Sequence, residues 1–365
     1  MTDRIPPAER TIMKRKILRT LGVAVALLLV LTAGEQQVFR FGADEAQAAI
    51  LGDFPARDDR ATPQQVLDQV AGQGDELTLL AAGDVAECGR EDTLGQVWPA
   101  LTYDLGLPVE VDRDGAGALQ TAALADRYPD DLVLGLGDLA YHRGTRAEFD
   151  TCFDPLWGAL VPRLLPTPGN HEYRVPGANG YYEYWGQQAG ADRTGHYALS
   201  WRNWLLLSLN SEDDADEGSA QRAWLDAQLA AHPDACVLAY FHKPAWSLRD
   251  RSGSEAARAL FARLEEAGAT AVLNGHNHFY ERTRPLDAVG QPAPEGLIGF
   301  TIGVGGETSH ATPTKASTAR AVFGETGLLR LTLGQDSLGW DFLSAGDGED
   351  LDSGVIPCRA RGQDA

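Results

Sequence analysis

The most constraining feature of this sequence is a short apolar run that stops abruptly at a turn, a pattern that occurs five times. Four runs end in Gly-Asp, Gly-Asn or Gly-His, and the fifth ends in a histidine without the glycine; they are LTLLAAGD, DLVLGLGD, LLPTPGN, TAVLNGH and ACVLAYFH. Apolar runs of this length that are bounded by turn residues are typical of buried strands. The sequence therefore predicts several strands that are covered on both faces.

Helix-like segments lie between these runs and fix the fold class. They span residues 115–127, 146–160, 219–231 and 255–267. Strands that alternate with helices predict an α/β fold with a largely parallel core. In such sheets ligands gather at the carboxyl ends of the strands. We therefore expect the polar residues after the runs to lie at one edge: Asp84, Asp138, Asn170, His171, His242, His276 and His278.

Changes in composition along the chain predict a linker, one catalytic domain and a tail. Residues 76–345 are predicted to form a single catalytic domain, preceded by a linker over 35–75 in which TPQQVLDQVAG forms one helix. Near the end, the stretches LIGFTIGVGG and GLLRLTLGQDSLGWDFLSA indicate an antiparallel hairpin. Residues 346–365 are predicted to be an acidic C-terminal tail.

The N-terminus and the cysteines indicate export. Basic residues precede an uncharged stretch over 20–34, which is shorter than the ~20 residues of a membrane-spanning helix. Residues 1–34 therefore match a signal peptide, with an uncleaved membrane anchor as the alternative. An even number of cysteines in an exported chain suggests two disulfides. We expect Cys88 to pair with Cys152, since each follows a candidate site strand, which leaves Cys236 with Cys358.

The net charge restricts the partners. The chain has 52 acidic and 31 basic residues, a net charge of -21. Such a surface repels nucleic-acid backbones and anionic membranes. It would also repel an anionic substrate, unless bound metal cations reverse the local field.

The residue types at the strand ends suit such cations. Carboxylate and amide oxygens suit harder cations, and imidazoles suit zinc, iron and manganese. One carboxylate can bridge two ions that lie roughly 3.5–4 Å apart. A single Gly-Asp or Gly-Asn-His is more often an ordinary turn than a ligand. Five such ends in order argue against that structural reading and favour a centre with two metal ions.

The same series carries a family resemblance. The segments "GD", "GDLAY", "GNHE", "FH" and "GHNHFYER" resemble those of the calcineurin-like metallophosphoesterases, and more narrowly of their purple acid phosphatase branch. The resemblance covers roughly residues 76–345. It implies a four-layer αββα sandwich with a dinuclear metal centre.

Two positions point to the narrower branch. Many members of the superfamily have a histidine ligand where this chain has Ala86, and in the purple acid phosphatase branch a tyrosine at the place of Tyr141 replaces it. A phenolate ligand favours Fe(III). The resemblance implies that metal one is bound by Asp84, Asp138, Tyr141 and His278. It implies that metal two, which is Zn, Mn or Fe(II), is bound by Asp138, Asn170, His242 and His276.

The activity implied is hydrolysis of small phosphomonoesters by a metal-activated hydroxide, with His171 as the catalytic residue that contacts the phosphate and protonates the leaving group. A phosphodiesterase acting on nucleotides or phospholipid head groups is the close alternative. A surface protein that binds phosphate without catalysis is the alternative from another class. The remaining histidines, including His196 and His310, are interpreted as structural or loop residues. The sequence does not specify the oligomeric state.

Overall fold

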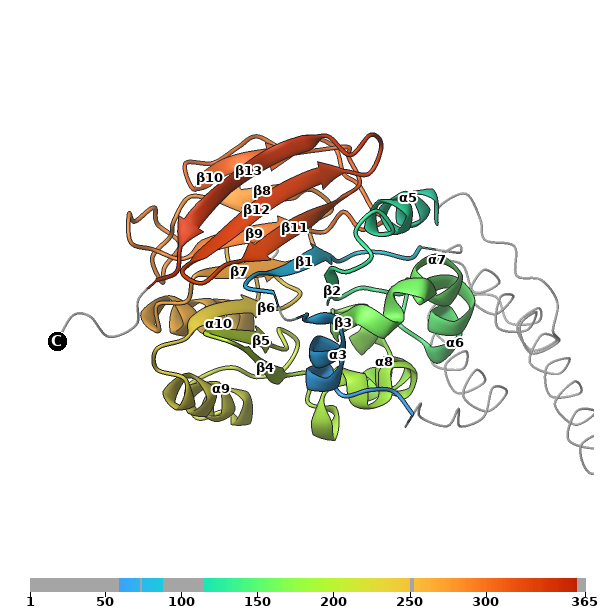
Figure 1. The fold of residues 1–365 in the computed structure, drawn as a ribbon, viewed down its shortest axis with the longest axis horizontal. Helices are drawn as coiled ribbons and strands as arrows, with labels where there is room; N and C mark the ends of the chain where they lie inside the picture. The colour runs from blue at the N-terminus through green and yellow to red at the C-terminus, as the bar shows by residue number, and fades with distance from the viewer. Residues whose placement is uncertain (1–58, 73, 88–114, 250–252, 360–365) are drawn as a thin grey trace, which may run out of the picture.

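The computed structural model describes residues 59–72, 74–87, 115–249 and 253–359. Two sheets face each other in these parts of the chain, and helices flank them (Figure 1). The six-stranded sheet has the order β13-β12-β11-β1-β2-β3, and the seven-stranded sheet has the order β10-β8-β9-β7-β6-β5-β4. This arrangement confirms the α/β class with two central sheets.

All five apolar runs form strands, but they are divided between the two sheets. The first sheet contains β1 (Leu77–Ala82), β2 (Leu132–Leu136), β3 (Leu164–Thr167), β11 (Gly327–Leu333), β12 (Ser337–Ser344) and β13 (Asp350–Pro357). The second contains β4 (Tyr197–Trp201), β5 (Trp204–Ser208), β6 (Cys236–Tyr240), β7 (Ala271–Asn274), β8 (Tyr280–Thr283), β9 (Ile298–Ile302) and β10 (Thr318–Val322). The polar strand ends therefore come from two facing sheets and not from one edge of a single sheet.

The predicted helices are present, with one segment more irregular than expected. Single helices form α5 (Ala116–Ala125), α9 (Ala220–Ala231) and α10 (Glu255–Glu266). The segment predicted as one helix over 146–160 is instead a series of short pieces: α6 (Arg146–Glu148), a π-helical turn (Phe149–Phe153), α7 (Asp154–Trp157) and a 3-10 helix (Gly158–Arg163). Further on lie α8 (Asn179–Trp185) and 3-10 turns at Glu172–Arg174, Pro176–Ala178, Gly186–Ala189 and Ala191–Arg193.

The apolar strands are buried on both faces because successive side chains point to opposite sides of a sheet. In β6, Leu238 and Tyr240 pack into the core between the sheets, whereas Val237 and Ala239 pack into a second core with α9 and α10. In Figure 1 these two helices lie along the seven-stranded sheet, and α5 to α8 lie at the other side of the molecule. Because both faces of these strands are covered by a core, nearly every residue in them is apolar, which explains the continuous apolar runs of the sequence.

The helix predicted within the linker forms α3 (Pro63–Val70), and it belongs to the folded domain. Thr62 caps it through a capping box with Gln65. Val66 and Leu67 are fully buried in the core between the sheets. The part of the predicted linker from 63 to 70 is therefore packed structure, because its apolar face has a partner that composition alone does not reveal.

The C-terminal region differs from its prediction in two ways. β11 and β12 form the expected antiparallel hairpin, but β9 lies in the other sheet, parallel to β7. Residues 350–357, which were predicted to lie in an acidic tail, form the edge strand β13 beside β12. Its acidic residues misled the interpretation, since an edge strand tolerates charge on its open face.

Two contacts fix this edge strand. Asp352 accepts hydrogen bonds from Tyr280 Oη at 2.7 Å and from Arg282 Nε at 2.8 Å. The Cys236–Cys358 disulfide, which was predicted, joins the end of the chain to β6. The other predicted pair includes Cys88, which lies outside the described residues.

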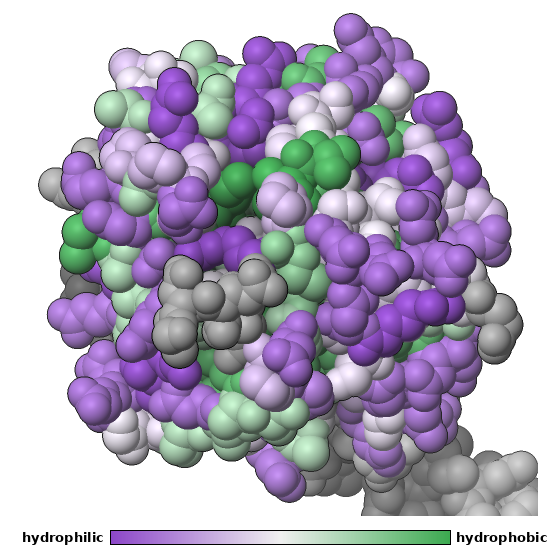
Figure 2. All heavy atoms as spheres, turned by 60° about the vertical axis from the view of Figure 1, so that its left-hand side comes forward, coloured by the Kyte–Doolittle hydropathy of each residue, from purple (hydrophilic) through white to green (hydrophobic). Residues whose placement is uncertain are grey.

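The face of the molecule drawn in Figure 2 is mostly hydrophilic. Figure 2 shows a face on which hydrophilic residues dominate and hydrophobic residues form only small areas. In the described part of the chain, no helix is long and apolar enough to cross a membrane. The predicted signal segment over 1–34 lies outside the described residues.

Candidate metal centre

The residues predicted for the site follow strand ends at which the chain turns sharply. Asp84, Asp138 and His276 each have a positive φ, at 57°, 50° and 71°. This region of backbone conformation is uncommon for residues other than glycine, and such strain concentrates at functional sites. The apolar-run pattern located these turns, but it gave no sign of their left-handed conformation.

Glycines make the close approach of these turns feasible. A Cβ on Gly137, which has a φ of +82°, would lie 2.7 Å from His242 Nδ1 and 2.9 Å from the Gly169 Cα. A Cβ on Gly275 would lie 2.8 Å from an Asp84 carboxylate oxygen. The close packing around these turns therefore requires a glycine before Asp138 and before His276.

One group of candidates converges on His242. Its Nε2 lies 3.1 Å from Asp138 Oδ2, 3.2 Å from Asn170 Oδ1 and 3.2 Å from His276 Nδ1. Its Nδ1 faces the carbonyl oxygen of Leu136 at 2.9 Å, so the Nδ1–H donates there and the Nε2 lone pair points into the group. Histidines that bind metals commonly donate their second N–H to a backbone carbonyl in this way.

A second group converges on Asp84. Tyr141 Oη donates to Asp84 Oδ1 at 2.7 Å, and His278 Nε2 lies 3.2 Å from the same oxygen. Tyr141 Oη and His278 Nε2 are 3.3 Å apart, which closes a triangle. The other carboxylate oxygen of Asp84 accepts the backbone N–H of His276 at 2.7 Å. The His276–His278 turn thus connects the two groups.

Ala86, which stands where many members of the superfamily have a histidine ligand, holds Tyr141 in place. Ala86 is buried, and its carbonyl accepts the backbone N–H of Tyr141 at 2.9 Å. Ala86 and Ala140 also pair as a short parallel bridge. The loops after β1 and β2 therefore run side by side, which brings Tyr141 to the Asp84 group.

The electrostatics of the cluster fit cations. Burial opposes ionisation of Asp84 and Asp138, but His278 and His242 outweigh it and lower the pKa of each carboxyl. In return Asp138 raises the pKa of His242 to about 10, although burial alone would lower it. Burial, followed by the charges of Asp84 and Asp138, raises the pKa of Tyr141. A phenolate at this position therefore needs a bound cation.

Burial also supports a metal at the first group. Asp138 and His242 of this group are each at most 2% exposed. Burial and the nearby charge of His242 lower the pKa of His276 to about 4, which keeps its imidazole neutral and able to coordinate. Oxygen and nitrogen atoms of Asp138, His242 and His276 lie within 4.8 Å of one another, a spacing that could hold an ion. The donor set fits the metals that the sequence implies.

His171 lies beside the first group. Its backbone N–H donates to Asp138 Oδ1 at 2.8 Å, and its Nε2 is 3.9 Å from Asp138 Oδ2. Its Nδ1 faces the carbonyl oxygen of His142 at 2.7 Å, and Arg174 Nη2 lies 3.1 Å from its Nε2. Burial lowers the pKa of His171 despite the charge of Asp138.

Glu172 has a role that the sequence did not reveal. Instead of facing the cluster as a ligand, its carboxylate binds backbone groups. Its carboxylate accepts the N–H groups of Asp138 at 2.9 Å, Leu139 at 2.8 Å and Gly169 at 2.7 Å. Burial and the charge of Asp138 raise its pKa to about 7. It ties together the turns that carry Asp138 and Asn170, and its position directly after His171 was the only available signal.

A glycine-rich loop also reaches the site, through Glu307, which no sequence pattern indicated. Glu307 Oε2 lies 4.0 Å from His278 Nδ1, and its backbone N–H donates to the Asp84 carbonyl at 3.2 Å. Burial and the neighbouring Glu87 raise the pKa of Glu307 to about 8. The histidine of the same loop, His310, is exposed.

Comparison with known proteins agrees with this geometry. Residues 115–280 match the family model of the calcineurin-like phosphoesterases. Over 190 residues the chain is 27% identical to Purple acid phosphatase 18 of Arabidopsis thaliana, a match that covers 47% of this chain and 42% of the plant protein. The chain thus spans less than half the length of that relative.

Two solved structures have a similar fold. A purple acid phosphatase isolated from yellow lupin (Lupinus luteus) seeds matches with a TM-score of 0.60 and 17% identity, over 78% of this chain and 54% of that chain. A dimetal phosphatase from Danio rerio matches with a TM-score of 0.52 and 16% identity, over 77% of this chain and 99% of that chain. At these identities the likeness concerns the fold.

Proposed function

We propose that this chain, which carries a calcineurin-like phosphoesterase domain of the purple acid phosphatase type, is an exported enzyme that hydrolyses small phosphate monoesters at a two-metal centre. The observation that carries the proposal is the convergence of Asp138, Asn170 and His276 on His242 Nε2, beside the triangle of Asp84, Tyr141 and His278. No purely structural role accounts for so many buried ionisable groups facing one another.

The two groups support the ligand set that the resemblance implies. Metal one would be held by Asp84, Asp138, Tyr141 and His278, and metal two by Asp138, Asn170, His242 and His276. When bound, the two ions supply an activated water and neutralise the phosphate oxygens. Tyr141 makes Fe(III) the expected ion at metal one, and Zn, Mn or Fe(II) occupies metal two.

The neighbouring residues provide for the leaving group and the phosphate charge. Because the carbonyl of His142 occupies Nδ1 of His171, Nε2 is the nitrogen left for the leaving group, and since Nε2 here accepts from Arg174, it can carry that proton only once the guanidinium turns to the phosphate. Arg174 places a guanidinium 3.1 Å from that nitrogen. The Arg174 guanidinium thus adds a positive charge to those of the metal ions. This suits a phosphate monoester, which carries up to two negative charges, better than a diester, which carries one.

The test combines metal analysis with a substrate panel. The purified full chain is expected to hold two metal ions and to hydrolyse p-nitrophenyl phosphate faster than bis(p-nitrophenyl) phosphate. Asp138→Asn should remove most metal and activity. Asp131→Asn, at a buried carboxylate that pairs with Arg330 away from the site, serves as the matched control. Faster diester turnover would favour the phosphodiesterase, and two bound metals without hydrolysis at any pH would favour the binding protein.

Export is part of the proposal. The Cys236–Cys358 disulfide supports an oxidising compartment, since structural disulfides persist there. Fractionation of the source cells, with sequencing of the mature N-terminus, would separate a secreted or periplasmic enzyme from one anchored at the surface. Recovery of the chain in the cytoplasm with its full N-terminus would contradict export.

A further inference from the structure

Glu281, which follows His278 in β8, carries a buried carboxylate outside the candidate ligand set. This carboxylate accepts hydrogen bonds from Ser247 Oγ at 2.8 Å, from the backbone N–H of Leu248 at 2.9 Å and from Thr318 Oγ1 at 2.8 Å. Ser247 and Leu248 lie in the loop after β6, and Thr318 begins β10. Glu281 therefore connects three segments that are far apart in the sequence.

The burial of this carboxylate has a free-energy cost. Burial raises the pKa of Glu281, although its hydrogen bonds oppose the shift. Replacing both partners of a buried hydrogen bond by apolar groups of the same shape is commonly almost neutral for stability. Stability of the fold alone therefore does not explain why a carboxylate stands here, and the segments that it connects are a better guide to its role.

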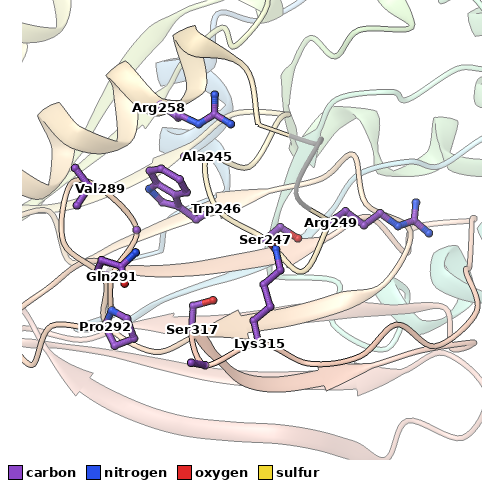
Figure 3. Close-up of a pocket in the computed structure, with 12 residues that line it drawn as sticks. Ala245, Trp246, Ser247, Arg249, Arg258, Val289, Gln291, Pro292, Lys315 and Ser317 are labelled. Carbon is purple, nitrogen blue, oxygen red and sulfur yellow. Dashed lines mark hydrogen bonds between the residues drawn. The ribbon is translucent and has the colours of Figure 1, made fainter.

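One of these segments, the loop over 245–249, follows the ligand candidate His242 and is incompletely packed. It lines a pocket of about 290 Å³, which the segments 289–292 and 315–317 also line (Figure 3). Figure 3 shows Ser247 on this loop with Lys315 reaching it, and the Lys315 ammonium donates to the Ser247 carbonyl at 2.9 Å. Because a pocket borders the loop, hydrogen bonds contribute a larger share of what fixes its position.

Ser247 extends this connection to the turn between β7 and β8. Asn277, which lies between His276 and His278, is only 2% exposed, and its Nδ2 donates to Ser247 Oγ at 2.8 Å. The Ser247 hydroxyl donates in turn to Glu281, so it acts as acceptor and donor at once. A chain of hydrogen bonds therefore joins the tip of the histidine turn to β8.

The tip of this turn has a backbone conformation that needs support. Its base is fixed by the N–H of Gly275, which donates to the carbonyl of His242 at 2.9 Å. Further along, His276 has a φ of 71°, and its N–H donates to Asp84 Oδ2 at 2.7 Å. A left-handed residue other than glycine persists where its surroundings hold it in place. The side-chain bond of Asn277, directly after His276, supplies such a hold.

We propose that Glu281 is a positioning residue of the metal centre: through Ser247 and Asn277 it fixes the turn that presents two histidines to the metal ions. Because it concerns the ligands of that centre, this inference rests on the proposed function. Glu281 thus has the same role for the loops of the seven-stranded sheet that Glu172 has for those of the six-stranded sheet. It acts through the histidines and is not itself a ligand.

The test uses variants of the full chain that break the hydrogen bonds at different points. Ser247→Ala removes the hydroxyl that joins Asn277 to Glu281, and Glu281→Met removes the acceptor. Glu281→Gln keeps an acceptor for Ser247, because the Thr318 hydroxyl can turn to accept from the new amide. Thr318→Val is the matched control, since it removes the bond to the other carboxylate oxygen, on the side of β10.

Two measurements separate positioning from stability. In the metal-free chain, hydrogen exchange at the His276 N–H should become about tenfold faster or more in Ser247→Ala and Glu281→Met, and stay within about threefold of wild type in Glu281→Gln and Thr318→Val. In competition with a chelator, the first two variants should bind zinc about 10–100-fold more weakly than wild type, and the other two should not. Thr318→Val should still unfold at a lower urea concentration, because it loses a buried hydrogen bond.

A double variant checks that Ser247 and Glu281 act together. Ser247→Ala added to Glu281→Met should weaken zinc binding by less than about twofold more, because both changes break the same chain of bonds. Wild-type exchange and zinc affinity in Ser247→Ala would overturn the inference, as would equal losses of affinity in Thr318→Val and Ser247→Ala. A wild-type chain that binds no zinc would instead contradict the proposed function, and the exchange rates would still show whether Glu281 fixes the turn.

Discussion

Tyr141 Oη donates a hydrogen bond of 2.7 Å to Asp84 Oδ1, and the two side chains form a buried triangle with His278. Tyr141→Phe removes this oxygen while keeping the ring. If Tyr141 binds Fe(III) as a phenolate, the iron-loaded variant should lose its visible charge-transfer band and bind iron about 10–100-fold more weakly. The measurement is an absorption spectrum with iron analysis.

The control for this variant is Tyr173→Phe. Tyr173 donates no bond to the cluster, and its hydroxyl lies 2.7 Å from Asn210 Nδ2. It should keep the band. A wild-type protein that shows no band when loaded with iron, or a Tyr141→Phe protein that keeps one, would contradict the assignment to the purple acid phosphatase type.

Substitution of two histidines distinguishes a residue of the metal site from a structural one. His278→Ala removes a donor at the Asp84 triangle and should lower kcat by about 100-fold or more, since a metal would lose one ligand. His196 instead packs against the Trp224 ring at 4.5 Å, and His196→Ala should change kcat by less than about threefold. Turnover of a chromogenic phosphate ester measures both. Similar losses in the two variants would show that the ligand set is wrong.

Glu172→Gln tests the carboxylate that ties the turns after β2 and β3. A glutamine can accept from one side only, and its NH2 group would face a backbone N–H donor, so Asp138 and Asn170 should shift. We expect the affinity for metal two to fall about 10–100-fold, as measured by competition with a chelator. Asp131→Asn, at a buried carboxylate away from the site, should lower stability without lowering metal affinity. Equal metal affinity in Glu172→Gln and wild type would disprove the positioning role.

The edge strand β13 gives a stability prediction with a defined sign. Burial would raise the pKa of Asp352, but the hydrogen bonds from Arg282 and Tyr280 outweigh it and lower the pKa below its ordinary value of 3.8. A lowered folded-state pKa stabilises the protein above pH 3.8, and this stabilisation is lost as the pH falls through the folded value. Asp352→Asn should therefore cost about 1 kcal/mol at pH 7, a figure reduced because solvent partly screens the group.

Urea unfolding of wild type and Asp352→Asn at pH 7 and near pH 2.5 measures this difference. The cost of the substitution should shrink at the lower pH, where Asp352 approaches its neutral form. Asp234→Asn, which alters an exposed acidic residue in the turn before β6, should show no such dependence beyond the change in net charge. A cost that is the same at both pH values would mean that the carboxylate contributes by packing alone.

Several features could be predicted because local sequence determines them. The apolar runs before Asp84, Asp138 and His276 have the length and the turn residues of buried strands, and each forms one. The helix caps at Thr62 and Ser219 are likewise local. Other features depend on partners far along the chain. β13 was missed because its acidic residues suit an edge strand as well as a free tail, and only the pairing with β12 distinguishes the two.

The sequence alone therefore determined which residues stand at the strand ends and which chemical groups they offer, since both follow from short-range pattern and residue type. The tertiary structure decided how these groups meet. It brought the ends of β1, β2 and β3 in one sheet against those of β6 and β7 in the other. It also recruited Glu172 and Glu307. These contacts depend on the packing of two sheets against each other, and packing is a property of the whole chain that no local run of residues encodes.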